Sequence, residues 1–252
     1  MKYGGNTSCL EIRCGPHVLI FDGGTGLRLF DKSWADAAAL DADLFFTHTH
    51  LDHICGWPYF TRLSRPETAL TVWCGNLLPD HGIEGVLGDL LREPFVPVRL
   101  DRLHARITYN DFHAGETIEP RADIRIRTAP LNHPQGATGY RVEYGGRSIC
   151  YVTDTEHAPG EPDQNILGLI EGADLFIYDC TYTDDEFPAH VNWGHSTWQE
   201  GARLADAARV KTFVVFHHDP DHNDAFMDAV ARDVEAARRG SVVACEGMTL
   251  RP

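Results

Sequence analysis

The sequence predicts an α+β protein in which β-sheets lie inside and helices lie outside. Two observations carry this prediction. The first half of the 252 residues is rich in short strand-type segments separated by glycine and proline turns, and the second half alternates helix patterns with apolar strands. Sheets and helices that follow one another in this way bury the apolar faces of both. No repeat, low-complexity tract or Ser/Gly/Pro linker divides the chain, so we predict one domain over residues 1–252.

In the first half, runs of β-branched and aromatic residues predict strands. Residues 8–13 and 17–22 are expected to form a hairpin that turns at Cys14-Gly15-Pro16. A Gly-interrupted stretch between Asn76 and Arg92 predicts a weak helix. Further strands are expected over residues 43–47, 68–74, 105–109, 123–128, 138–144 and 147–153, the last two joined by a Gly145-Gly146 turn.

In the second half, each predicted helix is followed by a predicted strand. Thr197 and Glu200 have the spacing of a capping box, which predicts where the middle helix begins. Gly240 is expected to end the last helix. The predicted helices cover residues 164–171, 197–208 and 224–239, and the strands that follow them cover residues 174–178, 212–216 and 241–245.

Composition narrows the function classes. The formal net charge is −15 and the longest basic run is Arg238-Arg239, so we expect no extended nucleic-acid partner. No apolar run approaches the ~18 residues of a membrane span and no signal-peptide pattern begins the chain, so we expect a cytoplasmic protein without a membrane partner. Seven cysteines without a C-x-x-C pair predict reduced thiols.

A cluster of histidines predicts a metal site. The hexapeptide His48-Thr49-His50-Leu51-Asp52-His53 directly follows the apolar run Leu44-Phe45-Phe46. Imidazole nitrogens and a carboxylate suit zinc, manganese or iron. A solvated polar turn is the alternative, but such a turn has no need of three histidines. Three other polar residues follow apolar runs: His133, Asp154 and His217. Each alone could be a strand that runs into a polar loop, but together with the hexapeptide they make a complete ligand set.

The order of these residues resembles the metallo-β-lactamase superfamily over nearly the whole chain. The resemblance implies a four-layer αββα sandwich and two divalent metal ions, with zinc favoured and manganese or iron as alternatives. It implies that Asp154 bridges the metals and that Asp22, otherwise a plain turn carboxylate, hydrogen-bonds to ligand imidazoles. It assigns one metal to His48, His50 and His133, and the other to Asp52, His53 and His217.

A second segment points to one branch of this superfamily. Trp193-Gly194-His195-Ser196-Thr197 resembles the His-Ser-Thr motif of the phosphodiesterase branch, which includes tRNA 3′-processing nucleases and cyclic phosphodiesterases. His195 comes just before a capped helix N-terminus, which favours an anion. The resemblance implies catalytic roles for Asp52, which would orient the nucleophile, and His195, which would act on the leaving side. Relatives begin with one more strand, so we expect a strand and part of the substrate rim to be missing.

The expected function is hydrolysis of a small phosphodiester, cyclic or linear, by a hydroxide that bridges two metals. Hydrolysis of a carboxylic ester, thioester or lactam is an alternative, because the same metals polarise a carbonyl. A tRNase Z-like nuclease is another alternative, and a metal-holding sensor is the non-enzyme alternative. The expected partner is a small-molecule phosphodiester. The sequence leaves open whether the protein forms a homodimer.

Overall fold

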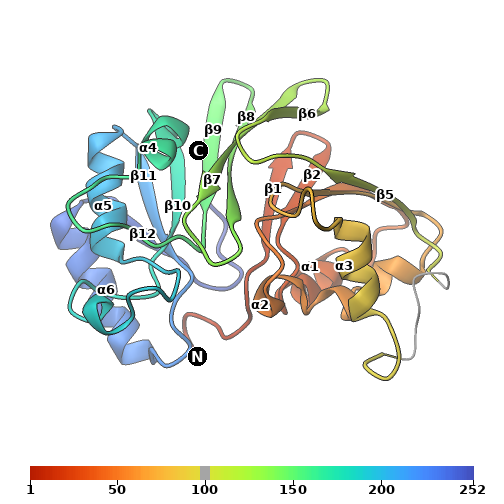
Figure 1. Cartoon of the computed structure of the whole chain (residues 1–252), viewed down its shortest axis with the longest axis horizontal. Helices are drawn as coiled ribbons and strands as arrows, with labels where there is room; N and C mark the ends of the chain where they lie inside the picture. The colour runs from red at the N-terminus through yellow and green to blue at the C-terminus, as the bar shows by residue number, and fades with distance from the viewer. Residues whose placement is uncertain (97–102) are drawn as a thin grey trace. The chain divides into compact units, whose positions relative to one another are not determined.

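The computed structural model describes residues 1–96 and 103–252, which form two compact units (Figure 1). One unit comprises Asn6–His113, and the other comprises Met1–Gly5 together with Ala114–Pro252. Each unit contains one β-sheet, helices that pack on it and a hydrophobic core of its own. The predictions of a single domain and of a homodimer stay predictions.

The Asn6–His113 unit is built on a five-stranded mixed sheet in the order β1-β2-β3-β4-β5. The predicted hairpin is confirmed: β1 (Leu10–Cys14) and β2 (His17–Phe21) are antiparallel, and the remaining neighbours are parallel. The other strands are β3 (Leu40–Phe46), β4 (Thr68–Cys74) and β5 (Arg106–Asp111). The helical segments are α1 (Leu27–Ser33), α2 (Leu51–Ile54), η1 (Trp57–Tyr59), η2 (Thr61–Ser64) and α3 (Ile83–Leu90).

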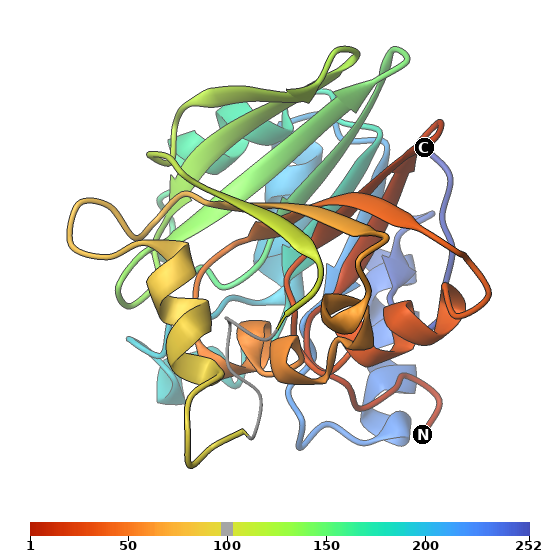
Figure 2. The ribbon, with the colours of Figure 1, turned by 90° about the vertical axis from the view of Figure 1, so that its right-hand side faces the viewer.

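The second unit is built on a seven-stranded sheet in the order β12-β11-β10-β9-β8-β7-β6. Figure 2 shows its long strands β7, β8 and β9 side by side, in an antiparallel arrangement. The strands from β9 to β12 are parallel. The strands are β6 (Thr117–Arg121), β7 (Ile124–Leu131), β8 (Ala137–Tyr144), β9 (Arg147–Val152), β10 (Leu175–Asp179), β11 (Thr212–Phe216) and β12 (Val242–Val243). The helical segments are α4 (Gln164–Ile170), η4 (Phe187–Ala189), α5 (Trp198–Ala207) and α6 (Asp224–Ala237).

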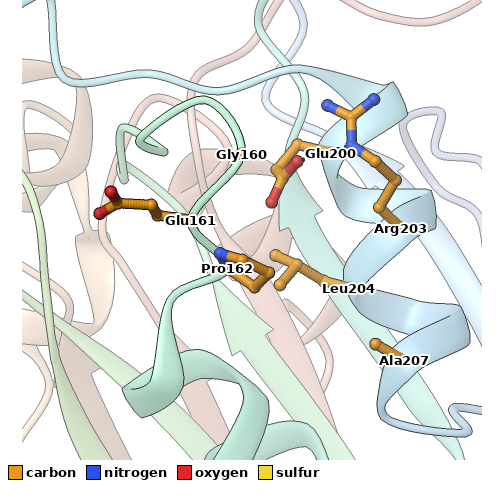
Figure 3. A pocket seen from close by; sticks show the side chains of 7 residues that line it. All are labelled: Gly160, Glu161, Pro162, Glu200, Arg203, Leu204 and Ala207. Carbon is orange, nitrogen blue, oxygen red and sulfur yellow. Dashed lines mark hydrogen bonds and ion pairs between the residues drawn. The ribbon is translucent and has the colours of Figure 1, made fainter.

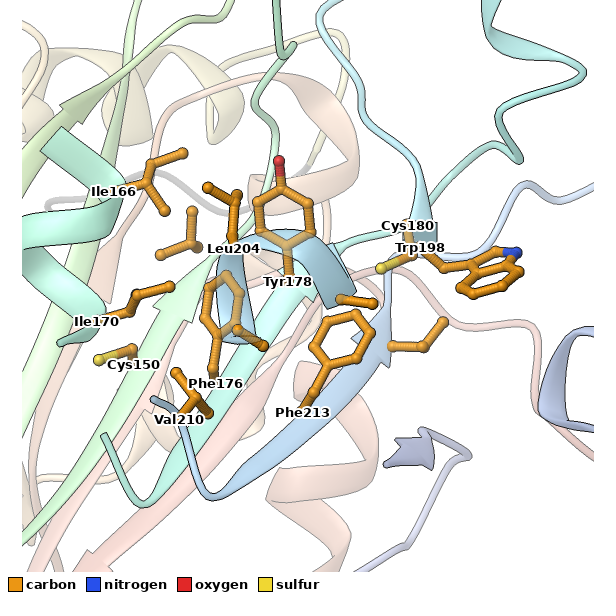
Figure 4. Packing of buried hydrophobic residues seen from close by; sticks show 14 of the residues in the cluster. Cys150, Ile166, Ile170, Phe176, Tyr178, Cys180, Trp198, Leu204, Val210 and Phe213 are labelled. Atoms are coloured by element: carbon orange, nitrogen blue, oxygen red, sulfur yellow. The ribbon is translucent and has the colours of Figure 1, made fainter. Parts of the chain in front are cut away.

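Aromatic and branched side chains pack the helices of this unit onto its sheet (Figure 4). Phe176 of β10 and Phe213 of β11 are fully buried and meet Leu204 of α5 and Ile166 of α4 in one cluster. Burying a side chain of this size stabilises the fold by about 1.5–3 kcal/mol. The parallel strands are therefore packed rigidly. The polar residues that follow them begin at a rigid edge of the sheet.

One strand and two α-helices escaped prediction, each for a local reason. β6 contains Pro120, which argues against a strand, but β6 lies at the edge of its sheet, where a residue without an N–H is tolerated. Helix α1 has seven residues and α2 has four, which is too short for a helical period to show in the sequence.

The capping box is confirmed in part: Thr197 Oγ1 accepts from Glu200 N (3.1 Å), but the Glu200 carboxylate accepts from Arg203 Nε instead.

The described helices include none that is long and apolar enough to cross a membrane. All seven cysteines are free thiols, and Cys14, Cys74, Cys150 and Cys180 are buried, as predicted for core cysteines.

A buried carboxylate joins three strands of the second unit. Asp174 Oδ2 accepts from Ser148 N (2.8 Å), and Oδ1 pairs with Lys211 Nζ (2.6 Å) and Arg147 (3.2 Å). Burial acts to raise the pKa of Asp174, but the hydrogen bonds from Lys211, Ser148 and Arg147 outweigh it and hold the pKa at about 2. Asp174 thus stays ionised and links the starts of β9, β10 and β11.

Replacing Asp174 by asparagine is expected to lower the free energy of unfolding at pH 7 by about 1–2 kcal/mol, a modest figure because Lys211 and Arg147 are largely exposed. The folded pKa is depressed, so the stabilisation is present above the unfolded pKa of about 4 and lost as pH falls towards 2. Urea unfolding of both proteins should show the difference narrowing over that window. A difference independent of pH, or one matched by the exposed control Asp36→Asn, would contradict this role.

Candidate metal centre

The hexapeptide leaves the end of β3 and turns into α2. Because β2 and β3 are parallel, Asp22, which follows β2, lies at the same edge of the sheet as Thr47. Asp22 Oδ1 accepts from the Thr47 N–H (2.8 Å), and Asp22 Oδ2 lies 2.9 Å from His53 Nδ1. All three residues are completely buried. The predicted contact between Asp22 and a histidine of the hexapeptide is present.

This contact decides which nitrogen of His53 faces a ligand. A carboxylate only accepts hydrogen bonds, so Nδ1 donates to Asp22 and the lone pair is on Nε2. Nε2 lies 3.1 Å from Asp52 Oδ2. The ring centroid of His48 lies 4.5 Å from that of His50 and 4.3 Å from that of His53. A carboxylate behind the imidazole is the usual arrangement of a metal-binding histidine, so this donor set fits a metal.

Three glycines allow the loop after β2 to pack directly beneath α2. Gly23 N donates to His53 O (2.7 Å), and Gly56 N donates to Gly23 O (2.8 Å). A Cβ on Gly56 would overlap Gly24 O, and a Cβ on Gly24 would overlap Asp52 O. The glycines therefore serve close backbone approach around the hexapeptide.

In the second unit, strand direction gathers the remaining candidates at one edge. Asp154 and His217 follow the parallel strands β9 and β11, and Asp179 ends β10 between them. β7 runs in the same direction as β9, since two antiparallel pairings separate them, so His133 emerges at this edge too. His195 reaches it from the loop before α5.

These side chains lie close together around Asp154. His217 Nε2 is 3.2 Å from Asp154 Oδ1, and His133 Nε2 is 3.7 Å from Asp154 Oδ2. His195 stacks on His217 with ring centroids 5.1 Å apart. Ligand atoms of one group lie within 4.8 Å of one another, a spacing suited to a metal ion: Asp154, Asp179, His195 and His217.

Hydrogen bonds orient two of these histidines for the same task. His133 Nδ1 donates to Gly194 O (2.8 Å), and since a carbonyl only accepts, the lone pair of His133 is on Nε2. The Thr181 hydroxyl directs its one proton to Asp179 Oδ1 or His217 O (both 2.9 Å), so Thr181 Oγ1 accepts from His217 Nδ1 (3.0 Å). Both Nε2 atoms point towards Asp154, and neutral imidazoles beside a carboxylate are what a divalent cation of the zinc type prefers.

Asp179 is not among the predicted site residues, although it ends β10 at the same sheet edge. Its Oδ2 accepts from His195 Nδ1 (3.0 Å) and Thr155 N (3.1 Å), and its Oδ1 accepts from Thr181 Oγ1 (2.9 Å). Burial acts to raise the pKa of Asp179, but the charge and hydrogen bond of His195 leave it lowered. Burial acts to lower the pKa of His195, but Asp179 raises it above its usual value. The buried Asp179 carboxylate therefore holds the His195 ring at this edge and favours its protonated form.

Glu156 joins the segment of His133 to the loop of His195. Its Oε1 accepts from Asn192 N (3.0 Å), and its Oε2 accepts from Gly194 N (2.9 Å). The carbonyl oxygen of the same Gly194 accepts the hydrogen bond from His133 Nδ1. Its backbone exchanges two hydrogen bonds with Asn132, the neighbour of His133. A Cβ on Gly194 would overlap His133, so only glycine fits there.

Replacing Glu156 by glutamine is expected to lower metal affinity and turnover by about 10- to 100-fold, as is typical when support behind a metal ligand is lost. An amide has one acceptor oxygen, so one of the two N–H groups loses its partner. Metal titration and steady-state kinetics would measure the loss. The exposed neighbour Glu161→Gln is the matched control, and equal behaviour of the two variants would show that Glu156 does not position the site.

Strained backbone marks the same segments. Among the described residues, six non-glycine residues adopt the left-handed region, and five of them flank or belong to the candidate site: Asp22, Gln135, Asp154, Asn192 and His217. Such conformations persist only where the surroundings over-determine them, and they gather at functional sites. Aspartate and asparagine tolerate this region better than most residues.

A surface hollow of about 120 Å³ involves none of the candidate site residues. It is lined by the loop Gly160–Pro162 and by Glu200, Arg203, Leu204 and Ala207 around α5 (Figure 3). None of these lining residues is a predicted ligand. The hollow is therefore no part of the candidate metal centre.

Comparison with known proteins identifies the class. The family model of the β-lactamase superfamily domain matches residues 17–218. The chain is 23% identical to ribonuclease Z of Haloarcula marismortui over 98% of this chain and 91% of that protein. It superposes with a TM-score of 0.70 on the metallo-β-lactamase fold protein YhfI of Bacillus subtilis, at 19% identity, covering 99% of this chain and 96% of that one. For the short form of human tRNase Z the TM-score is 0.69 at 18% identity, covering 100% and 95%.

The chain belongs to the β-lactamase superfamily, and it is a metal-dependent hydrolase with the metallo-β-lactamase type of fold. The predicted fold class and the predicted resemblance to the phosphodiesterase branch are confirmed. Membership implies divalent metal ions, for which the histidine and aspartate groups offer ligands.

The expectation that extended nucleic acid is an unlikely partner is wrong. Relatives that match nearly the whole chain are named as ribonucleases. The net charge of −15 sums the entire chain and says nothing about the charge at one edge of a sheet. It also omits bound divalent cations, which are often the largest local charges in a site.

Proposed function

We propose that this hydrolase is a dinuclear metal-dependent phosphodiesterase. One observation carries the proposal: the His195 imidazole is held by buried Asp179 (3.0 Å) beside the Asp154 carboxylate and His217. A carbonyl hydrolase needs metals and a water, but a protonated histidine fixed next to the ligands suits a reaction that expels an alkoxide from phosphorus.

The ligand assignment rests on the order of ligands in the family and on the donor chemistry of each group. One divalent ion would be held by His48, His50 and His133, and the other by Asp52, His53 and His217, with Asp154 as the shared carboxylate. Zinc suits these imidazole and carboxylate donors, and manganese and iron are the alternatives.

Bound ions of this kind activate a water and offset charge on the phosphoryl oxygens. The chain's own residues would do the rest. Asp52, whose side chain is 41% exposed, would accept a proton from the nucleophile and orient it. His195 would deliver a proton from Nε2 to the leaving oxygen, while Asp179 keeps hold of Nδ1–H and stabilises the imidazolium.

A panel of substrates tests this proposal. The metal-loaded protein should hydrolyse bis(p-nitrophenyl) phosphate and leave a lactone, a thioester and a lactam intact. Chelation should abolish turnover, and zinc or manganese should restore it. Turnover of the carbonyl substrates alone would overturn the proposal, and two bound metals with no turnover of any substrate would favour the metal-holding sensor.

An RNA substrate is favoured by one specific finding, the match to ribonuclease Z over 98% of this chain and 91% of that protein. A 3′-extended tRNA transcript and a small cyclic phosphodiester, offered to the same preparation, would rank the two substrate classes by kcat/KM. Faster cleavage of the transcript would identify an RNA-processing enzyme, and faster opening of the cyclic diester would identify a small-molecule phosphodiesterase.

A further inference from the structure

An exposed tryptophan stands two residues before His195. The Trp193 side chain lies in the loop that leads to α5, and the residue is 62% exposed. Its neighbour Val191 is 49% exposed. Tryptophan is largely buried in most proteins. An exposed indole close in the chain to a candidate catalytic residue therefore suggests a binding surface for a ligand.

A chain of aromatic contacts connects this indole to His195. Trp193 meets His190 edge to face, with ring centroids 5.1 Å apart and an interplanar angle of 88°. His190 is stacked on the buried ring of Tyr182 at 4.2 Å, and Tyr182 meets His195 edge to face at 6.2 Å. Three successive ring contacts thus connect the exposed indole to the group that would act on the leaving oxygen.

The backbone on both sides of Trp193 is held in place. Asn192 and Gly194 have left-handed conformations, with φ of 71° and 85°. Their N–H groups donate to the two oxygens of Glu156 at 3.0 and 2.9 Å, and Trp193 N donates to His190 O at 3.1 Å. At a non-glycine residue such as Asn192, this conformation persists only where the surroundings over-determine it.

The chemistry of the loop narrows the occupant. Between His190 and His195 the loop contains no lysine or arginine, and both Glu156 oxygens accept hydrogen bonds from it, so Trp193 has no lysine or arginine beside it in the loop to bind a phosphate. A rigid, water-exposed indole offers a flat π-face. Planar nucleobases at single-stranded ends stack on such faces, and they do so with any sequence because every base has a π-face.

We propose that Trp193 is a stacking platform for the nucleobase next to the scissile phosphate, so that the substrate is a nucleotide phosphodiester. The inference rests on the proposed phosphodiesterase function and names its substrate class. It makes Trp193 a specificity-determining residue that contacts the base, with no part in the bond cleavage.

Two diesters with the same leaving group separate the base from the phosphate. Thymidine 5′-p-nitrophenyl phosphate carries a base, and methyl p-nitrophenyl phosphate does not. Trp193→Ala should lower kcat/KM for the thymidine diester by about 5- to 100-fold, mainly through KM, and change it less than twofold for the methyl diester. Trp193→Phe should recover most of the loss. Phe95→Ala, which removes an aromatic residue that is 74% exposed, is the control.

A binding arm keeps this inference distinct from the proposed function. Calorimetry with metal-loaded protein would compare adenosine 5′-monophosphate with ribose 5-phosphate, and wild type should prefer the nucleotide by at least fivefold, a preference lost in Trp193→Ala. That result supports stacking even if no diester is turned over. Equal losses for both diesters, no preference for the nucleotide, or a change of oligomeric state as the sole effect of Trp193→Ala would overturn it, even with an active phosphodiesterase.

Discussion

The Asp154→Asn variant is expected to lose metal binding and almost all turnover. Asp154 is 2% exposed and has both carboxylate oxygens within 3.7 Å of a histidine Nε2, so it would be the shared ligand of the centre. Its φ of 60° is tolerated by asparagine, which has nearly the same shape and keeps the backbone conformation. The variant therefore changes charge and little else.

We expect kcat to fall by about 10³-fold, the equivalent of several kcal/mol of metal-assisted stabilisation. Metal content by elemental analysis should drop below that of wild type, and the rise in melting temperature on adding zinc should shrink, because metal binding stabilises the folded state by mass action. The matched control is Asp163→Asn, which preserves the N-cap of α4. If Asp154→Asn retained wild-type metal content and turnover, Asp154 would not be a ligand.

The His195→Ala variant is expected to keep its metals and lose turnover. Without the proton donor, kcat for a diester with a ribose or alkyl leaving group should fall by about 10²–10⁴-fold. With p-nitrophenolate as the leaving group the loss should be much smaller, because this group departs without a proton. The comparison of leaving groups therefore detects proton donation, which a merely structural histidine would not influence.

Metal analysis decides between two readings of His195, since its ring also lies within ligand distance of Asp154, Asp179 and His217. Full metal content with a leaving-group-dependent loss supports proton donation. Loss of a metal, or an equal loss for both leaving groups, would make His195 a ligand or a structural residue. His81→Ala, an exposed histidine of the Asn6–His113 unit, provides the control.

Much of the strand pattern was predictable because it depends on local alternation. The segment expected over residues 68–74 is β4 without a shift, and β8, β9 and β11 begin or end within one residue of expectation. Polar residues that follow apolar runs also stand out locally, which is how His133, Asp154 and His217 were predicted as ligands. Very short or edge elements such as α2 and β6 lack such a signal.

The contacts of Asp179 and Glu156 could not be predicted from local sequence patterns. Asp179 ends an apolar strand much as Asp154 follows one, but its partner His195 is 16 residues away, and their contact depends on β10 lying between β9 and β11. Glu156 acts on Gly194, 38 residues further along the chain. A periodic pattern of neighbouring residues does not predict a hydrogen bond between residues so far apart in the chain.

By itself, the sequence determined which types of candidate ligand the chain offers and their order along it, because spacing and alternation are properties of neighbouring residues. The tertiary structure decided which nitrogen of His53 and of His133 carries the lone pair, which carboxylate accepts from His195, and which residues take a left-handed backbone. These features follow from strand order and direction, which bring distant residues to one sheet edge, and hydrogen bonding there depends on distances that only the folded chain sets.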